Sequence, residues 1–172
     1  MAESFPLPEL PRGTLPDPAA RLARLHEARP LVLAAVEGET DPIAIQATLA
    51  CVLWHTFAWA NWCGFYRRVS PTQLSVGPYQ GSLGCLHIAL SRGVCGAAAR
   101  EGKAQVVPDV DAFPGHIACD DATRSELVVP VIARGELRGV LDLDSHAPDA
   151  FSRAEADRLV TLLRDVLDQA TF

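Results

Sequence analysis

Three cysteines differ from ordinary core residues because each lies in a stretch that glycine marks as irregular. They stand in GSLGCLH, RGVCGAA and GHIACDD, as Cys85, Cys95 and Cys119. A thiol is a nucleophile as its thiolate, which local donors or positive charge favour. Loops also bring together residues that are distant in sequence. These thiols therefore indicate redox chemistry, in which one attacks and another resolves the oxidised product as a disulfide. Near Cys119, His116 would favour the thiolate, whereas Asp120 and Asp121 would oppose it.

Metal binding is the alternative use of these thiols. Zinc could take Cys85, Cys95 and Cys119 together with His87 or His116. The sequence has no C-x2-C pair, however, and the gaps of 10 and 24 residues between the cysteines match no usual zinc spacing. Redox chemistry is the better interpretation.

The other two cysteines, Cys51 and Cys63, lie in apolar stretches, so we expect both to be buried packing residues. Cys63 follows Trp62 and is expected beside the functional pocket, where an unproductive disulfide could form. The chain has an odd number of cysteines, five, and its N-terminal stretch lacks the apolar run of an ordinary secretory signal. We therefore expect reduced thiols and a cytoplasmic location.

Three carboxylates fall within predicted strands. Asp142 and Asp144 alternate with Leu141 and Leu143, so the two aspartates share one face of a strand and the leucines pack from the other. Glu126 enters the partner strand. Facing carboxylates repel one another unless a proton, a cation or an amine lies between them. The cluster therefore suits a small ligand with an amino group.

Two aromatic residues, Trp62 and Tyr66, are four apart in NWCGFY and also share a strand face. Core packing is the usual fate of such side chains. An aromatic wall over a methyl-bearing or cationic ligand is the functional alternative.

Composition excludes other classes of protein. The formal net charge of −6 argues against nucleic-acid binding, which needs clustered Lys and Arg. The stretch 43–63 is uncharged, but Gln46, His55 and Asn61 interrupt it, which favours a core helix over a membrane span.

The elements that must position these groups follow an α+β order. Residues 1–17 are rich in proline and predict a leader, and residues 18–172 predict a single domain. Leu22 and Leu25 are expected on one helix face and the arginines on the other. Helices are predicted over 19–29, 41–60, 93–102 and 151–167. Strands are predicted near 63–69, 73–79, 104–110, 125–132 and 137–145. The stretch 79–91 has the character of a loop, and the last two strands form a hairpin across ARGE. We expect a central antiparallel sheet flanked by helices on both sides.

The motifs NWCGFY, GPYQG, SRGVCG, VPDVDAFPGHIACD, SELVVPV and GVLDLDS occur in this order. In this order and combination the chain resembles the free methionine-(R)-sulfoxide reductases, a family of GAF-fold enzymes. The resemblance covers about Asn61 to the C-terminal helix.

The resemblance implies a role for each candidate residue. Cys119 would attack the sulfoxide sulfur, Cys85 would resolve the product, and Cys95 would be a further thiol in the disulfide relay. The substrate-binding residues it implies are Trp62, Tyr66, Glu126, Asp142 and Asp144.

The resemblance also implies the partners of the reaction. The substrate would be free methionine-(R)-sulfoxide, and thioredoxin with NADPH would restore the thiols. No cofactor, metal, nucleic acid or membrane would take part, and the protein would be a homodimer. A GAF domain that senses a small ligand or redox state without turnover is the alternative, and a structural or regulatory module ranks third.

Overall fold

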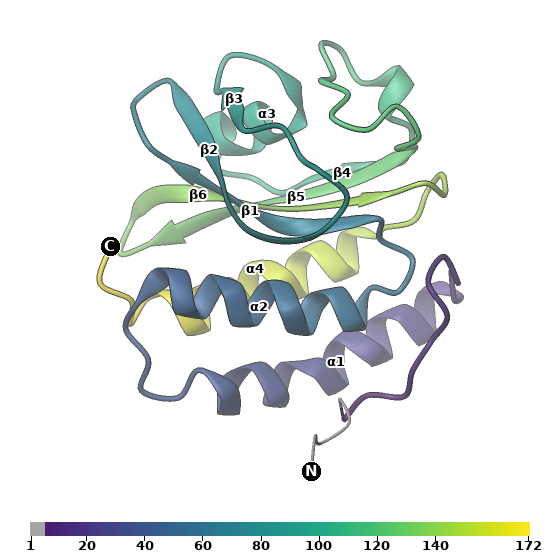
Figure 1. Ribbon diagram of the computed structural model, residues 1–172, viewed down its shortest axis with the longest axis vertical. Helices are drawn as coiled ribbons and strands as arrows, with labels where there is room; N and C mark the ends of the chain where they lie inside the picture. The colour runs from purple at the N-terminus through teal and green to yellow at the C-terminus, as the bar shows by residue number, and fades with distance from the viewer. Residues whose placement is uncertain (1–5) are drawn as a thin grey trace.

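The computed structural model describes residues 6–172, which form one sheet with helices on both of its faces (Figure 1). The helices are α1 (Pro18–Ala35), α2 (Pro42–Thr56), α3 (Gly93–Glu101), α4 (Arg153–Leu167) and a 3-10 turn at Val110–Ala112. The strands are β1 (Trp62–Arg68), β2 (Gln73–Gly81), β3 (His87–Ala89), β4 (Gln105–Val107), β5 (Ser125–Ala133) and β6 (Glu136–Ser145).

The sheet is antiparallel throughout, with the strand order β3-β2-β1-β6-β5-β4. Helices α2 and α4 cover one face of the sheet, α1 packs on the outer side of these two helices, and α3 lies on the other face with the long loops (Figure 1). The predicted α+β class, with helices on both sides of the sheet, is confirmed. The predicted hairpin is also present: Arg134 and Gly135 both have positive φ, as a type I′ turn between β5 and β6 requires.

Strand alternation creates two apolar clusters, one on each face of the sheet. Leu141 and Leu143 of β6 belong to the larger cluster, which lies under α1, α2 and α4. Trp62 and Tyr66 of β1 belong to the smaller one, under α3. Because successive strand side chains point to opposite faces, Asp142 lies on the α3 side together with the aromatics. The functional residues therefore gather on the face opposite the main core.

The prediction for 79–91 is wrong in part. Strand β2 continues to Gly81, and His87–Ala89 form the short edge strand β3, paired with Gln73–Ser75. Only Ile88 of this strand is buried. A three-residue edge strand with one buried side chain leaves no alternating pattern to detect. The intervening loop, which holds Cys85, is as expected.

Of the three arginines of α1, which we expected on the helix face opposite Leu22 and Leu25, Arg29 is exposed but the other two are not. Arg21 and Arg24 are buried, with exposed fractions of 4% and 9%. Arg24 donates to the carbonyl oxygens of His55 and Thr56 at the end of α2. Arg21 donates to Ala150 O, 2.7 Å away. Each guanidinium satisfies carbonyls that burial would otherwise leave unpaired, and this offsets the cost of removing it from water.

The described part of the predicted leader packs against the helical layer. Leu7 is buried in the main core, and Gly13 donates its N–H to Ala58 O at 2.8 Å. The Arg12 guanidinium lies 3.4 Å from the centre of the Trp54 ring and bonds to Phe57 O at 3.0 Å. Residues 1–5 lie outside the described residues. The division into a leader and one domain stays a prediction.

Two expectations about the remaining cysteines are wrong. Cys51 is exposed on α2 rather than buried, because it faces away from the sheet. Cys63 is fully buried as predicted, but it packs in the main core, on the sheet face opposite the aromatic residue before it. It therefore does not line the pocket, and the sheet separates it from the loop thiols. Burial is also the main cause that raises the Cys63 pKa.

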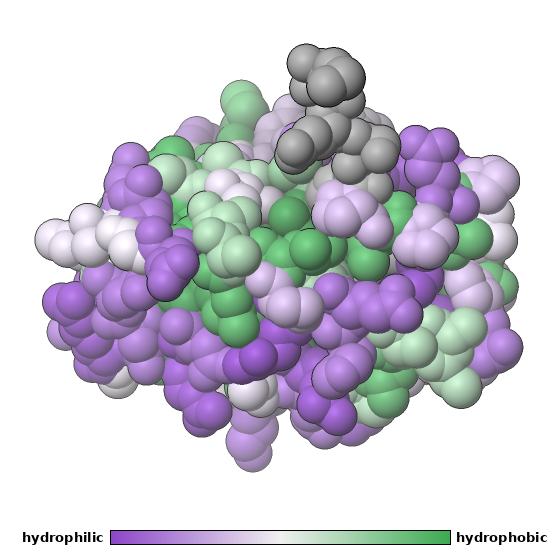
Figure 2. Space-filling model, turned by 90° about the horizontal axis from the view of Figure 1, so that it is seen from below, coloured by the Kyte–Doolittle hydropathy of each residue, from purple (hydrophilic) through white to green (hydrophobic). Residues whose placement is uncertain are grey.

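The outer face of the helical layer mixes polar and apolar side chains, with apolar ones gathered near its middle (Figure 2). Ile43 is 41% exposed on α2, the helix that also exposes Cys51. None of the helices in the described part of the chain combines the length and the apolar run needed to cross a bilayer.

Candidate active site

A disulfide joins two of the three loop cysteines. Cys85, between β2 and β3, is bonded to Cys119, between the 3-10 turn and β5, and their Cα atoms lie 5.4 Å apart. Loop backbone bonds hold the Cys119 segment: His116 N donates to Phe113 O, and Thr123 N donates to Asp120 O. Loops thus bring together two sulfurs that are 34 residues apart in sequence. The pairing implied by the resemblance is present.

This disulfide also argues against the zinc site considered as an alternative use of the cysteines. Cys85 and Cys119 are bonded to each other, so neither sulfur is a thiolate ligand, and His87 is exposed on the edge strand β3. The residues that could hold a cation are Cys95, Glu126 and Asp142, whose ligand atoms lie within 4.8 Å of one another. Each would first have to release a proton.

Three carboxyl groups meet on the central strands β5 and β6. Glu126 pairs directly with Asp144, and Asp142 lies two residues further along the same face. Burial is the largest cause that raises the pKa of each group well above its usual range, and the charge of a neighbouring carboxylate adds to it. Burial and mutual repulsion therefore favour the protonated forms of these carboxyl groups. Asp142 Oδ1 has no hydrogen-bond partner among the described residues, so a polar atom of this cluster is available to a ligand.

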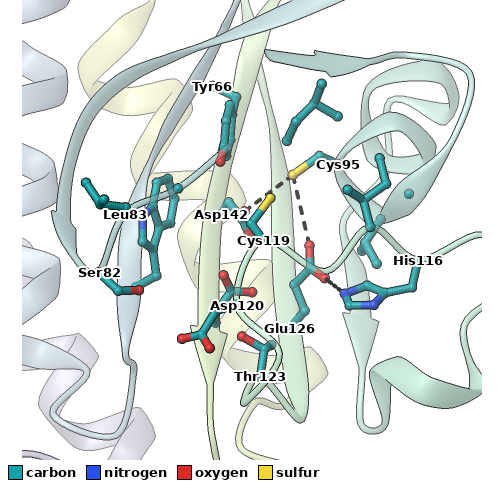
Figure 3. Close-up of a pocket in the computed structure, with 17 residues that line it drawn as sticks. Tyr66, Ser82, Leu83, Cys95, His116, Cys119, Asp120, Thr123, Glu126 and Asp142 are labelled. Atoms are coloured by element: carbon teal, nitrogen blue, oxygen red, sulfur yellow. Dashed lines mark hydrogen bonds and ion pairs between the residues drawn. The ribbon is translucent and has the colours of Figure 1, made fainter. Parts of the chain in front are cut away.

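Cys95 closes the cluster from the start of α3. It is 4% exposed, and its Sγ lies 3.4 Å from Asp142 Oδ2 and 4.0 Å from Glu126 Oε1 (Figure 3). Burial first, and then the two carboxylates, raise its pKa well above that of a free thiol. The helix N-terminus would favour a thiolate, but burial and the acids outweigh it. Cys95 is therefore a protonated thiol that donates to Asp142.

His116 connects the loop that carries Cys119 to the carboxyl cluster. Its Nε2 lies 3.5 Å from Glu126 Oε2 (Figure 3). Burial lowers the pKa of His116, although Asp111 opposes the shift. The ring is therefore mainly neutral at pH 7. It contacts the acid cluster rather than supplying positive charge to Cys119.

Asp120 organises a second set of contacts, which the sequence analysis missed. Its carboxylate accepts bonds from Ala122 N at 2.9 Å and Asn61 Nδ2 at 3.2 Å, and it lies 3.1 Å from His146 Nε2. The Ala122 bond is the largest cause that lowers the Asp120 pKa, so this carboxylate is charged. Asp120 directly follows Cys119, so its contacts connect the Cys119 loop to the ends of β1 and β6. Its position directly after Cys119 was the only signal available in the sequence.

Aromatic rings form one wall of the site. Trp62 stacks on Tyr66 and on Tyr79, with ring centres 5.3 Å apart in both pairs. A Cβ at Gly84 would lie 2.9 Å from Tyr66 Oη and 3.0 Å from Trp62 Nε1, so only glycine lets the Cys85 loop approach these rings. The indole N–H of Trp62 is buried and has no partner in the described chain. The shared face predicted for Trp62 and Tyr66 is confirmed.

The carboxyl cluster, the aromatic wall and the disulfide surround one small cavity of about 30 Å³. The disulfide and the Ser82–Gly84 segment lie on its loop side, and Thr123 lies at its base with a hydroxyl that has no partner in the described residues. A cavity that holds even benzene has a volume of about 150 Å³. The disulfide ties together the two loops that border the cavity of this protein.

The site residues expected from the sequence therefore meet in one place. The residues that line the cavity include Trp62, Tyr66, Cys95, Cys119, Glu126, Asp142 and Asp144. Cys85 adjoins this set through its bond to Cys119.

Comparison with known proteins identifies the family of this chain. The GAF domain model matches residues 41–171. Free methionine-R-sulfoxide reductase of Escherichia coli is 39% identical over 137 residues, which are 78% of this chain and 82% of that protein. The chain belongs to the free methionine-R-sulfoxide reductase family of GAF domain proteins.

A solved structure and a further relative are also similar to this chain over most of its length. The X-ray structure of free methionine-R-sulfoxide reductase from Neisseria meningitidis, in complex with its substrate, is 38% identical with a TM-score of 0.82 and covers 94% of both chains. Protein YtsP of Bacillus subtilis is 42% identical over 80% of this chain and 84% of its own length.

Proposed function

We propose that this protein reduces free L-methionine-(R)-sulfoxide to L-methionine, with Cys119 as nucleophile and Cys85 as resolving thiol. The observation that carries the proposal is the loop disulfide beside a cavity lined by three carboxyl groups. The names of the E. coli and N. meningitidis relatives support the same activity.

The carboxyl cluster is proposed to bind the ammonium group of the free amino acid. Glu126, Asp142 and Asp144 lose protons readily once a cation lies among them, because the cation offsets burial and mutual repulsion. A peptide-bound or N-acetylated methionine sulfoxide lacks this cation and leaves a buried carboxylate unpaired. That costs about 3–5 kcal/mol, which lowers kcat/KM at least a hundredfold. The aromatic wall of Trp62 and Tyr66 suits the apolar methylthio end.

The first chemical step is attack of the Cys119 thiolate on the sulfoxide sulfur. A protonated carboxyl group of the cluster gives its proton to the sulfoxide oxygen, which is otherwise a poor leaving group. The S–O bond of the substrate breaks, and so does the transient bond between Cys119 Sγ and the sulfoxide sulfur, which leaves the oxygen on Cys119 as the hydroxyl of a sulfenic acid and releases methionine. The carboxyl groups with raised pKa supply this proton at neutral pH.

The second step is condensation of the Cys85 thiol with this sulfenic acid, which releases water and forms the disulfide. An external dithiol, thioredoxin supplied by NADPH, then restores both thiols in the cytoplasm, and no bound cofactor or metal takes part. Cys95 is proposed as a further thiol of the relay. Because the Cys95 thiol is protonated, it is a slow nucleophile, and we expect it to react only after Cys119 and Cys85 have formed their disulfide.

A coupled assay tests the activity. NADPH oxidation by thioredoxin and thioredoxin reductase is followed after addition of free L-methionine-(R)-sulfoxide, with the (S) epimer and the N-acetyl compound as comparisons. We expect turnover of the free (R) form only, loss of turnover in Cys119→Ser, and wild-type turnover in Cys51→Ser. Without reductant, the reduced enzyme should form one methionine per chain. Binding without methionine formation would contradict a reductase and indicate a sensor.

The uncharged outer face of α2 is proposed as a homodimer contact. This helix carries no Asp, Glu, Lys or Arg between Pro42 and Thr56 and exposes Ile43 and Cys51. Sedimentation of the wild type and of Ile43→Glu tests the contact. We expect a dimer for the first and a monomer for the second, and a wild-type monomer would contradict the proposal.

A further inference from the structure

Two leucines beside the disulfide are unusually exposed. Leu83 is 84% exposed and Leu86 is 69% exposed, whereas the next large apolar side chain in the described residues, Val69, is 51% exposed. They lie two residues before and one residue after Cys85. Exposed apolar groups of this size, gathered at one reactive bond, are typical of an interaction site.

The loop presents these leucines in an ordered way. Leu86 O accepts a hydrogen bond from Val76 N at 3.0 Å, which ties the loop to β2. Gly84 lies against the rings of Trp62 and Tyr66. The backbone on both sides of Cys85 is therefore fixed, and a partner that binds the leucines loses little free energy in ordering them.

Charge distinguishes the two loops that the disulfide joins. The stretch from Gln73 to Ser91 contains no Asp, Glu, Lys or Arg, although the chain carries a net charge of −6. Asp120 and Asp121 instead follow Cys119 directly. An attacking thiolate is an anion, so an approach over the Cys85 loop meets no carboxylate of the 73–91 stretch, whereas an approach over the Cys119 loop meets two.

We propose that Leu83 and Leu86 form the docking surface for a protein dithiol reductase, which breaks the disulfide by attack on Cys85. This inference rests on the proposed function. The reductase thiolate forms a bond to Cys85 Sγ, the bond between Cys85 and Cys119 breaks, and Cys119 leaves as a thiolate that takes a proton. The second reductase thiol then attacks its own partner sulfur in the mixed disulfide, which releases Cys85 and leaves the reductase oxidised.

Reduction of oxidised protein by two reductants tests the docking surface. Leu86→Ser and the double variant Leu83→Ser/Leu86→Ser are oxidised with diamide and reduced by thioredoxin or by dithiothreitol. We expect kcat/KM for thioredoxin to fall about tenfold in the double variant, with an unchanged rate for dithiothreitol. Val69→Ser removes another exposed apolar side chain at a distance from the disulfide in sequence, and it should match the wild type with both reductants. If thioredoxin reduced the double variant as fast as the wild type, or if the double variant lost equally with both reductants, the docking surface would be overturned.

Trapping tests the point of attack. Thioredoxin with its second active-site cysteine replaced by serine is mixed with the oxidised protein, and the mixed disulfide is mapped by mass spectrometry. A link to Cys85 is expected, and a link to Cys119 would overturn the assignment. Neither experiment uses a sulfoxide. A failure of docking is therefore distinguishable from a failure of the proposed activity, which the single-turnover yield of methionine measures.

Discussion

The Asp142→Asn substitution is expected to stabilise the fold while it damages the site. Folding raises the pKa of this carboxyl, chiefly through burial and then through the charge of Glu126. A group of this kind contributes stability below its unfolded pKa of about 4, and that contribution is lost as pH rises toward its folded pKa. At pH 8 the wild type therefore carries a cost that a neutral amide avoids.

The magnitude follows from the surroundings of the side chain. Asp142 is 5% exposed, and its Oδ1 has no partner in the described residues. The cost that the carboxyl imposes on the folded state grows by about 1.4 kcal/mol for each pH unit above its unfolded pKa until the folded pKa is reached. In a chain of 172 residues, a gain of about 2 kcal/mol raises Tm by about 4–8 °C. Turnover of the sulfoxide should fall at least tenfold, because the amide cannot supply a proton.

Thermal unfolding of the reduced protein between pH 4 and pH 8 measures this effect. The increase in Tm should be largest at pH 8 and should vanish near pH 4, where the wild-type carboxyl is protonated. Asp157→Asn, on the exposed face of α4, is the control and should change Tm by less than about 1 °C. A variant that is less stable than the wild type at pH 8, or equally shifted at both pH values, would refute the reasoning.

Three further substitutions or measurements test the fold. Arg24→Ala should lower the free energy of unfolding in urea by about 1–3 kcal/mol, because it removes the donor to the buried Thr56 carbonyl at the end of α2; an effect below about 0.5 kcal/mol would contradict that role. Gly64→Ala should lower the free energy of unfolding by about 1–3 kcal/mol, since its new Cβ overlaps Tyr79 on the neighbouring strand. A wild-type urea midpoint would contradict this and show that β2 can shift without cost. In the reduced native protein Cys51 should react with a thiol reagent within seconds and Cys63 only on unfolding; equal rates would contradict their burial.

Periodicity explains why part of the site was predictable. Asp142 and Asp144 alternate with two leucines, so one strand pattern fixed both the core face and the functional face. The same alternation placed Trp62 with Tyr66. Each inference used neighbours within a few residues, where strand geometry determines direction.

Contacts between distant side chains and backbone groups were not predictable. Arg24 looks like a surface residue until its partners at the end of α2 are known, and those lie more than 30 residues away. Asp120 likewise binds residues 59 and 26 positions away. Such bonds follow no period, because the tertiary fold alone brings the partners together. The exposure of Cys51 depended in the same way on which face of α2 meets the sheet.

The division of the site between strands and loops has an evolutionary consequence. Glu126, Asp142 and Asp144 belong to the central strands, whereas Cys85 and Cys119 belong to surface loops that tolerate change. Under the proposed function, losing the loop sulfurs would leave a receptor for a small amine. Acquiring two of them would turn such a receptor into a catalyst without any rearrangement of its framework.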